Sequence, residues 1–244
     1  MKVLVIIPTY NEAESILAVI DGLLSLPFDL HLLVVDDHSP DGTSTLVKEV
    51  NSDRIQVLDR DAKSGLGAAY RAGFTWALLQ PTFSHLVTMD GDGSHRWQDL
   101  TRLLERAKNA DVVMGTRWMA GGAIENWPKY REFISRLGTS YARWALKMPL
   151  NDLTGGFRVY SVHLLRRINI ENIISSGYCF QIEMIRAAEA AGGTFAQEPI
   201  TFIERERGKS KMSRQIVAEA LIKVTLWAVQ RRIRNNADKL HYVK

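Results

Sequence analysis

The chain has 244 residues, 46% hydrophobic and 24% charged, a balance typical of a globular protein with one sizeable core. Its net charge of +4 is too small to indicate nucleic acid as a partner, although the last third of the chain is rich in Arg and Lys. Because Cys179 is the only cysteine, an internal disulfide and a cysteine-ligated metal site are excluded. The uneven positive charge instead favours contact with anionic phosphates or a membrane surface.

The first half of the chain alternates between short aliphatic runs and helix-like segments. Strands are predicted at residues 3–7, 30–35, 54–58, 85–89 and 111–115. Continuous aliphatic runs are typical of strands buried on both faces of a parallel sheet. The alternation predicts an α/β fold with a Rossmann-like, mostly parallel sheet and helices on both faces. Ligands of such sheets lie beyond the carboxyl ends of the strands, which carry Pro8, Asp37, Asp90 and Arg117.

The predicted strand at 85–89 runs into the turn Asp90-Gly91-Asp92. Two carboxylates separated by one glycine present hard anionic oxygens at a sheet edge, where Mg²⁺ or Mn²⁺ can be held together with a diphosphate. Asp and Gly are also ordinary turn formers, so the same residues taken alone fit a solvated turn equally well. The neighbouring motifs decide between these interpretations.

After Arg117 the pattern changes, and a helix is predicted up to Met148. Its apolar face carries Phe133, Ile134, Leu137, Tyr141, Trp144, Ala145 and Met148. Such an amphipathic helix either packs against its own domain or lies in a membrane interface, and the sequence leaves both open. Arg131 and Ser135 lie four residues apart on one helix face, so they can reach the same phosphate.

A last strand is predicted at 199–203, and the segment 204–213 that follows carries four cations together with Gly and Ser. Such a run is usually a solvated face, but its place after a strand favours a loop that closes over phosphates. A helix is predicted at about 215–234, where Lys223 interrupts the apolar run. No stretch of about 18 uncharged apolar residues is present, so the chain is not expected to span a bilayer.

These motifs together resemble the inverting glycosyltransferases of family 2, and within it the dolichol-phosphate and polyprenol-phosphate mannosyltransferases. The likeness covers nearly the whole chain, at residues 8–12, 36–43, 65–70, 89–95, 115–117, 152–160, 177–183 and 199–213. The first block and Asp90-Gly91-Asp92 are shared widely in the family. The blocks at 39–43, 177–181 and 204–213 are more specific to the polyprenyl-phosphate branch.

The resemblance implies a GT-A fold with a catalytic domain over 1–213, including an interfacial helix at 127–148, and a C-terminal amphipathic helix and tail over 214–244. It implies that the guanosine of GDP-mannose is held by Pro8, Tyr10, Glu12, Val35 and Asp37. The cations that clamp the donor are expected to be Arg205 and Lys211, with Arg117 also on the donor side.

For the metal and the acceptor, the resemblance assigns residues in the middle of the chain. Asp90, Gly91 and Asp92 match the acid-x-acid motif that holds Mg²⁺ or Mn²⁺, and Ser94 stands where some relatives place a metal-binding Gln. Position 91 is Gly where relatives often have Ala, a departure expected to be minor. The acceptor phosphate is expected to be received by Arg117, Arg131 and Ser135.

The acceptor chemistry indicates that no catalytic base is needed. A phosphate monoester has a second pKa of about 6, so it is already largely dianionic at neutral pH. Neither His38 nor His95 has an obvious carboxylate to orient it, and Asp152 is a fallback base should the acceptor be a hydroxyl. The resemblance implies that the catalytic residues are Asp90, Asp92, Arg117, Arg131 and Ser135.

The expected partners are GDP-mannose, a polyprenyl phosphate and the cytoplasmic face of a membrane, to which the protein would bind peripherally. A membrane-anchoring protein partner is left open. The alternatives are a sister enzyme that uses UDP-glucose and a catalytically silent membrane-associated scaffold. A dehydrogenase is disfavoured because the Gly-x-Gly-x-x-Gly fingerprint is missing around Gly65.

Overall fold

The structure, a computed structural model, describes residues 1–204, 214–234 and 241–242. The strands are β1 (Lys2–Thr9), β2 (Asp29–Asp36), β3 (Ile55–Asp59), β4 (His85–Thr88), β5 (Val112–Thr116), β6 (Ala123–Glu125), β7 (Arg158–Ser161), β8 (Thr194–Pro199), β9 (Thr201–Ile203) and β10 (His241–Tyr242). The helices are α1 (Ile16–Leu24), α2 (Thr43–Glu49), α3 (Leu66–Leu78), α4 (Asp99–Arg106), α5 (Lys129–Leu146), α6 (Val162–Leu165), α7 (Gly177–Ala190) and α8 (Arg214–Arg234).

The main sheet has eight strands in the order β10-β8-β5-β7-β4-β1-β2-β3. Its strands run parallel except β7, which lies antiparallel between β4 and β5. The prediction of an open, mostly parallel α/β sheet is confirmed. As a result, the carboxyl ends of β1, β2, β4 and β5 open onto one edge of the sheet.

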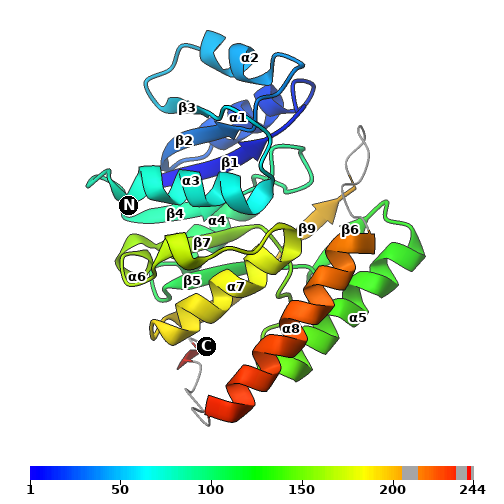
Figure 1. The fold of residues 1–244 in the computed structure, drawn as a ribbon. Coiled ribbons are helices and arrows are strands. Elements are labelled where there is room, and N and C mark those ends of the chain that lie inside the picture. The colour runs from blue at the N-terminus through cyan, green and yellow to red at the C-terminus, as the bar shows by residue number, and fades with distance from the viewer. Residues whose placement is uncertain (205–213, 235–240, 243–244) are drawn as a thin grey trace.

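Helices cover both faces of this sheet, as predicted (Figure 1). Along β1, Leu4 and Ile6 pack on the face covered by α3 and α7, whereas Val3, Val5 and Ile7 pack on the face covered by α1, α2 and α4. Alternate side chains of a strand point to opposite faces, so a run that is aliphatic at every position supplies both cores. Burial on both faces of the sheet therefore explains why β1 carries no polar face.

The single strand predicted at 199–203 is wrong, because the chain makes two strands there. β8 ends at Pro199 beside β5 in the main sheet, and β9 then pairs with β6 in a separate sheet of two strands. Between them, Ile200 is buried and its carbonyl accepts a hydrogen bond from the Ala123 N–H. Proline has no N–H to continue a ladder, which fits a change of sheet at this point.

Helices α5 and α8 lie side by side at one end of the molecule (Figure 1). The Tyr141 hydroxyl is 2.6 Å from Thr225 Oγ1, and Arg231 of α8 forms an ion pair with Glu189 of α7. α5 ends two residues earlier than predicted, because Lys147 takes a left-handed conformation with φ 51°. Within the described residues, no helix combines the length and apolar character needed to cross a membrane.

Candidate active site

The predicted turn after β4 is held by hydrogen bonds that leave its first carboxylate partly open to solvent. The Asp90 side chain is 32% exposed, while its N–H donates to Nδ1 of the buried His95 at 3.1 Å. Because Nδ1 accepts here, the imidazole carries its proton on Nε2. Asp92 closes the turn by accepting from the Ser94 N–H at 3.0 Å.

The Tyr70 hydroxyl donates to Asp90 Oδ1 at 3.4 Å. Burial, followed by the charge of Asp90, raises the pKa of Tyr70 well above its ordinary value, so the phenol stays protonated and remains a donor. His95 stacks against Phe157 on the other side of the turn. The Tyr70 hydroxyl therefore orients the Asp90 carboxylate, and His95 holds its backbone N–H.

Gly91 lies in a tighter space than the resemblance led us to expect. A Cβ at this position would lie 3.1 Å from Ile7 Cγ2 and 3.2 Å from Thr9 Cγ2. Its carbonyl accepts a hydrogen bond from Ser15 Oγ at 2.9 Å, which ties the turn to the start of α1. Exchanging Gly91 for Ala would thus require β1 or the turn to move by a few tenths of an ångström.

At the end of β2, Asp37 holds two segments together instead of presenting a free carboxylate. One oxygen accepts from Arg60 Nη1 at 2.5 Å, and the other accepts from the N–H groups of Ser64 at 3.0 Å and Gly65 at 2.8 Å. Asp37 is 4% exposed. In the structure, Asp37 therefore holds the loop at residues 60–65 that leads into α3.

The other residues expected to hold a nucleoside lie around this loop with different degrees of access. Pro8, Tyr10 and Glu12 are partly exposed, and Lys63 Nζ lies 3.7 Å from the centre of the Tyr10 ring. The Val35 side chain is fully buried in the core. Only the main chain of Val35 can therefore reach a ligand.

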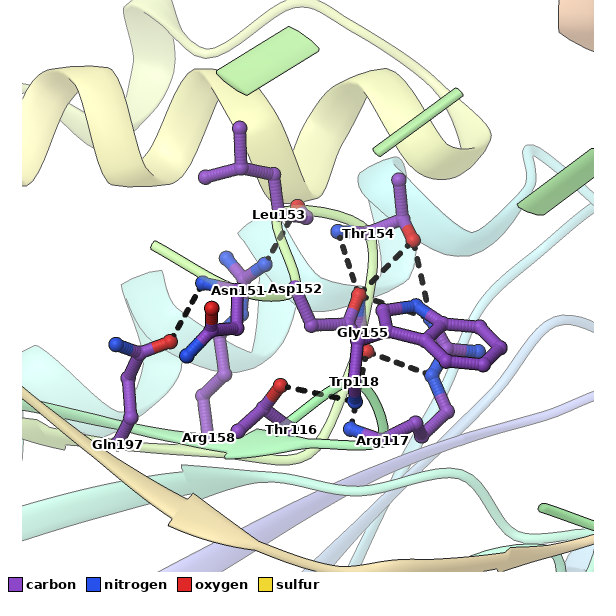
Figure 2. A network of polar contacts seen from close by, with 10 residues as sticks. All are labelled: Thr116, Arg117, Trp118, Asn151, Asp152, Leu153, Thr154, Gly155, Arg158 and Gln197. Carbon is purple, nitrogen blue, oxygen red and sulfur yellow. Dashed lines mark hydrogen bonds and ion pairs between the residues drawn. The ribbon is translucent and has the colours of Figure 1, made fainter. Parts of the chain in front are cut away.

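A buried ion pair joins the end of β5 to the turn that precedes β7 (Figure 2). Arg117 Nε and Nη2 donate to the two oxygens of Asp152 at 2.6 and 2.9 Å. The same carboxylate accepts from the N–H groups of Thr154 and Gly155, and Arg117 Nη2 also donates to the Thr154 hydroxyl at 3.0 Å. Arg117 is 6% and Asp152 0% exposed.

These contacts rule against Asp152 as a fallback base. Burial alone would raise the pKa of its carboxyl, but the charge of Arg117 and the hydrogen bonds outweigh burial and lower that pKa. Both oxygens are occupied, and the side chain has no exposed surface. An ionised, saturated carboxylate of this kind is a poor proton acceptor.

The three residues expected to receive the acceptor phosphate line one pocket between α5 and α8. Arg117, Arg131 and Ser135 share it with Thr154 at its polar end. The rest of the lining is Trp127, Ile134, Gly138, Tyr141, Ala142, Ile182, Ala220, Leu221 and Val224. The pocket thus combines a cationic end with an apolar wall.

Arg131 is not a lone cation in this pocket. Its guanidinium forms an ion pair with Glu204, lies 4.2 Å from the centre of the Trp127 ring, and leaves Nε buried without a hydrogen-bond partner among the described residues. A phosphate that binds Arg131 would compete with the Glu204 carboxylate. No local pattern indicates this pairing, because the two residues are 73 positions apart.

Comparisons with known proteins identify the family. Residues 4–168 match the family model described as Glycosyl transferase family 2. The chain belongs to glycosyl transferase family 2. It is 42% identical over 236 residues to the polyprenol monophosphomannose synthase of Mycolicibacterium smegmatis, covering 95% of this chain and 89% of that protein. It is 44% identical over 234 residues to the undecaprenyl-phosphate mannosyltransferase of Micrococcus luteus, covering 95% of this chain and 96% of that protein.

Solved structures of the glucosyl-3-phosphoglycerate synthase from Mycobacterium tuberculosis share the fold. The complex with phosphoglyceric acid has a TM-score of 0.69 at 16% identity, and the complex with Mn²⁺, UDP-glucose and phosphoglyceric acid has 0.68 at 17%. Both cover 93% of this chain and 80% of the other. The architecture is the GT-A fold of glycosyltransferases.

Not every expected site residue of this family 2 glycosyltransferase can be placed. Arg205 and Lys211, the expected donor clamp, lie outside the described residues. Conversely, sequence reasoning missed two polar side chains near the site, the partly exposed Glu204 and the buried Gln181. Both belong to motifs noted in the sequence, but their roles depend on partners far away along the chain.

The turn after β4 fits a hard divalent cation by the chemistry of its donors. Asp90 and Asp92 offer carboxylate oxygens, and the Ser94 hydroxyl is buried without a hydrogen-bond partner among the described residues. No cluster of three or more His, Cys, Asp or Glu side chains suited to a metal occurs in the described part of the chain. Two carboxylates would leave coordination positions for substrate oxygens, which suits Mg²⁺ or Mn²⁺.

We expect Asp152→Asn to destabilise the protein at neutral pH by about 3–5 kcal/mol, because Arg117 would stay buried without its charge partner. The folded-state pKa of Asp152 is lowered, so its contribution is present above the unfolded pKa of about 3.9 and is lost as pH falls through the folded pKa. Urea unfolding at pH 7 and at acidic pH measures both effects. A variant as stable as the wild type at pH 7 would contradict the role of the pair.

Proposed function

We propose that this family 2 glycosyltransferase moves mannose from GDP-mannose to a polyprenyl phosphate, with inversion at the anomeric carbon. The two curated relatives are named for polyprenol and undecaprenyl-phosphate mannosyl transfer and match 95% of the chain. The observation that carries the proposal is the pocket between α5 and α8. Its cationic end and apolar wall suit a phosphate that is attached to a hydrocarbon chain.

The donor would lie along the carboxyl edge of the sheet. The nucleoside is assigned to the end of β1 and β2, where Pro8, Tyr10 and Glu12 are partly exposed and Asp37 fixes the neighbouring loop. Val35 would contribute through its main chain. The diphosphate is assigned to the Asp90–Asp92 turn, with Arg117, Arg205 and Lys211 as the cations of the donor side.

Asp90 and Asp92, with Ser94, would hold Mg²⁺ or Mn²⁺, and that ion, when bound, supplies positive charge beside the diphosphate. The Asp90 carboxylate is oriented for this role by the Tyr70 hydroxyl, and the Asp90 backbone is held by its N–H contact to His95. Ser94 is held by its N–H contact to Asp92. These residues form one short turn, so a change at Asp92 also alters the place of Ser94.

In the reaction, an acceptor phosphate oxygen attacks the anomeric carbon on the face opposite GDP. The bond between that carbon and the β-phosphate oxygen breaks, and GDP leaves with the bonding electrons. The attacking phosphate is already dianionic, so no side chain has to remove a proton. Arg117, Arg131 and Ser135 would position the phosphate, and Arg131 must exchange its contact with Glu204 for the phosphate.

The same two helices present apolar side chains to solvent, which fits peripheral binding to a membrane. On α5, Tyr130, Phe133, Leu137 and Trp144 are 68, 63, 54 and 69% exposed. On α8, Leu221, Ile222, Leu226 and Val229 are 45–62% exposed. We propose that this surface rests on the cytoplasmic face of a membrane, so that the lipid tail stays in the bilayer while its phosphate enters the pocket.

Incubating the purified protein with GDP-mannose, Mg²⁺ and a polyprenyl phosphate should yield a mannosylated lipid, detectable by mass spectrometry. UDP-glucose in a parallel reaction tests the alternative donor.

Asp92→Ala should lower transfer by about a hundredfold or more, since one lost charge-stabilising interaction costs ~3 kcal/mol. It should also weaken metal-dependent GDP binding, whereas Arg131→Ala should lower transfer and spare GDP binding. Equal loss of GDP affinity in both variants would contradict the assignment of Asp92 to the donor and Arg131 to the acceptor.

Replacing Glu204 by Gln should favour the acceptor. Without the carboxylate, the phosphate no longer competes for Arg131, and we expect the KM for polyprenyl phosphate to fall by roughly 3- to 10-fold, as for one hydrogen bond to a charged group in a partly exposed site. Glu132→Gln is the matched control, because Glu132 pairs with Arg136 on the same helix outside the pocket. A higher KM in Glu204→Gln alone would mean that Glu204 positions Arg131 for catalysis.

Vesicle sedimentation tests the membrane surface. Phe133→Ser combined with Leu137→Ser should weaken binding to vesicles containing anionic phospholipid by at least about tenfold, since each buried side chain of this size contributes roughly 1.5–3 kcal/mol. Leu79→Ser is the control, because Leu79 is 77% exposed at the end of α3. Equal binding by both variants would contradict docking through α5.

A further inference from the structure

The side-chain amide of Gln181 is buried beside the catalytic turn with no hydrogen-bond partner among the described residues. Gln181 lies on the second turn of α7 and is 2% exposed, and both Oε1 and Nε2 are unpaired. Leaving one buried polar group unpaired typically costs about 1–3 kcal/mol. A buried amide in this state is a candidate contact for a ligand group.

The space over Gly156 adjoins both this amide and Asp90. A Cβ built on Gly156 would lie 3.4 Å from Gln181 Nε2, 3.6 Å from Asp90 Oδ1 and 3.7 Å from His95 Cε1. These are ordinary contact distances, so a small group fits there without displacing any of the three. The absence of a side chain at Gly156 creates this hollow.

The buried side chain of Arg158 holds the backbone of Gln181. The Gln181 carbonyl accepts from Nη1 of the fully buried Arg158 at 2.6 Å, and Arg158 Nη2 donates to the Leu153 carbonyl at 2.8 Å. One guanidinium thus ties α7 to the turn before β7. The backbone of Gln181, and with it the start of the side chain, is held in place before any ligand arrives.

The chemistry of the amide selects the class of ligand. A metal ion would satisfy only Oε1, and a phosphate oxygen would satisfy only Nε2. A sugar hydroxyl donates to Oε1 and accepts from Nε2, so it can satisfy both atoms. Because the hollow adjoins Asp90, the hydroxyl would belong to the hexose attached to the diphosphate.

We infer that Gln181 is a specificity-determining residue, whose amide hydrogen-bonds a hydroxyl of the transferred hexose in the hollow over Gly156. This inference rests on the proposed function, since it needs the donor sugar to lie beside Asp90. It adds a contact to the sugar itself, which the metal turn and the acceptor pocket do not supply. A site built to bind a hydroxyl rejects donors that lack it.

The test compares GDP-mannose with its monodeoxy analogues as donors. In the wild type, one deoxy donor should lose about 10- to 100-fold in kcat/KM beyond the others. In Gln181→Leu, transfer from GDP-mannose should fall by a similar factor, and the extra loss with that deoxy donor should disappear, while the Kd for GDP stays unchanged. Gly156→Ala should raise the KM for GDP-mannose and also spare GDP, because its methyl group would occupy the hollow.

Gln197→Leu provides the structural control. Gln197 Oε1 accepts from the Asn151 N–H, so this variant should lose stability and keep the donor selectivity of the wild type. Gln181→Leu with unchanged selectivity among deoxy donors would overturn the inference even where mannose is transferred. Should the wild type use UDP-glucose instead, the proposed donor is wrong, and the same comparison with deoxyglucose donors decides the role of Gln181.

Discussion

The ion pair between Arg117 and Asp152 is the interaction on which the whole site depends. It joins the end of β5 to the turn before β7, and the same carboxylate folds that turn by accepting from two of its N–H groups (Figure 2). The turn contributes residues to two parts of the site. It places Thr154 at the polar end of the pocket between α5 and α8 and Gly156 beside Asp90. One buried contact therefore supports both the proposed donor region and the proposed acceptor region.

The acidic residues at the sheet edge differ in exposure, because some hold the loops together whereas Asp90 remains partly exposed. Asp36, Asp37 and Asp152 are at most 4% exposed, and each accepts several hydrogen bonds from neighbouring loops. Asp90 retains 32% exposure of its side chain. A carboxylate that is buried and saturated stabilises its surroundings but has little capacity left for a ligand. Exposure and hydrogen bonding thus separate Asp90 from its neighbours where residue type alone does not.

Much of the fold could be predicted because it follows from local patterns. The aliphatic runs at β1, β2, β4 and β5, and the helix that became α8, appear in the sequence as continuous or periodic segments. The carboxyl-edge rule then placed Asp90 and Arg117 correctly at strand ends. The break between β8 and β9 was missed, because it depends on which strand each segment pairs with, and pairing is a long-range property.

The sequence allowed many of the site residues to be predicted, but not the ion pairs and hydrogen bonds that they form. Asp152 and Arg117 were both recognised, yet their mutual pairing, which removes Asp152 as a base, requires the turn to fold back onto β5. Arg131 and Ser135 were placed on one helix face by their spacing, and the structure brings both into the same pocket. The Glu204 contact and the unpaired amide of Gln181 come from segments that meet only in the folded chain. Such contacts leave no local pattern.

The geometry of α5 bears on how the proposed active site could act on a lipid. Residues 131 and 135 are four apart and line the pocket, whereas residues 133 and 137 follow on a different face and are exposed. At about 100° of rotation per residue, the exposed apolar face lies next to the pocket face and not opposite to it. Ile134, which lines the pocket and is 41% exposed, lies between the two faces. With a membrane on the exposed face, the lipid phosphate would pass along the apolar wall between α5 and α8 to reach Arg131.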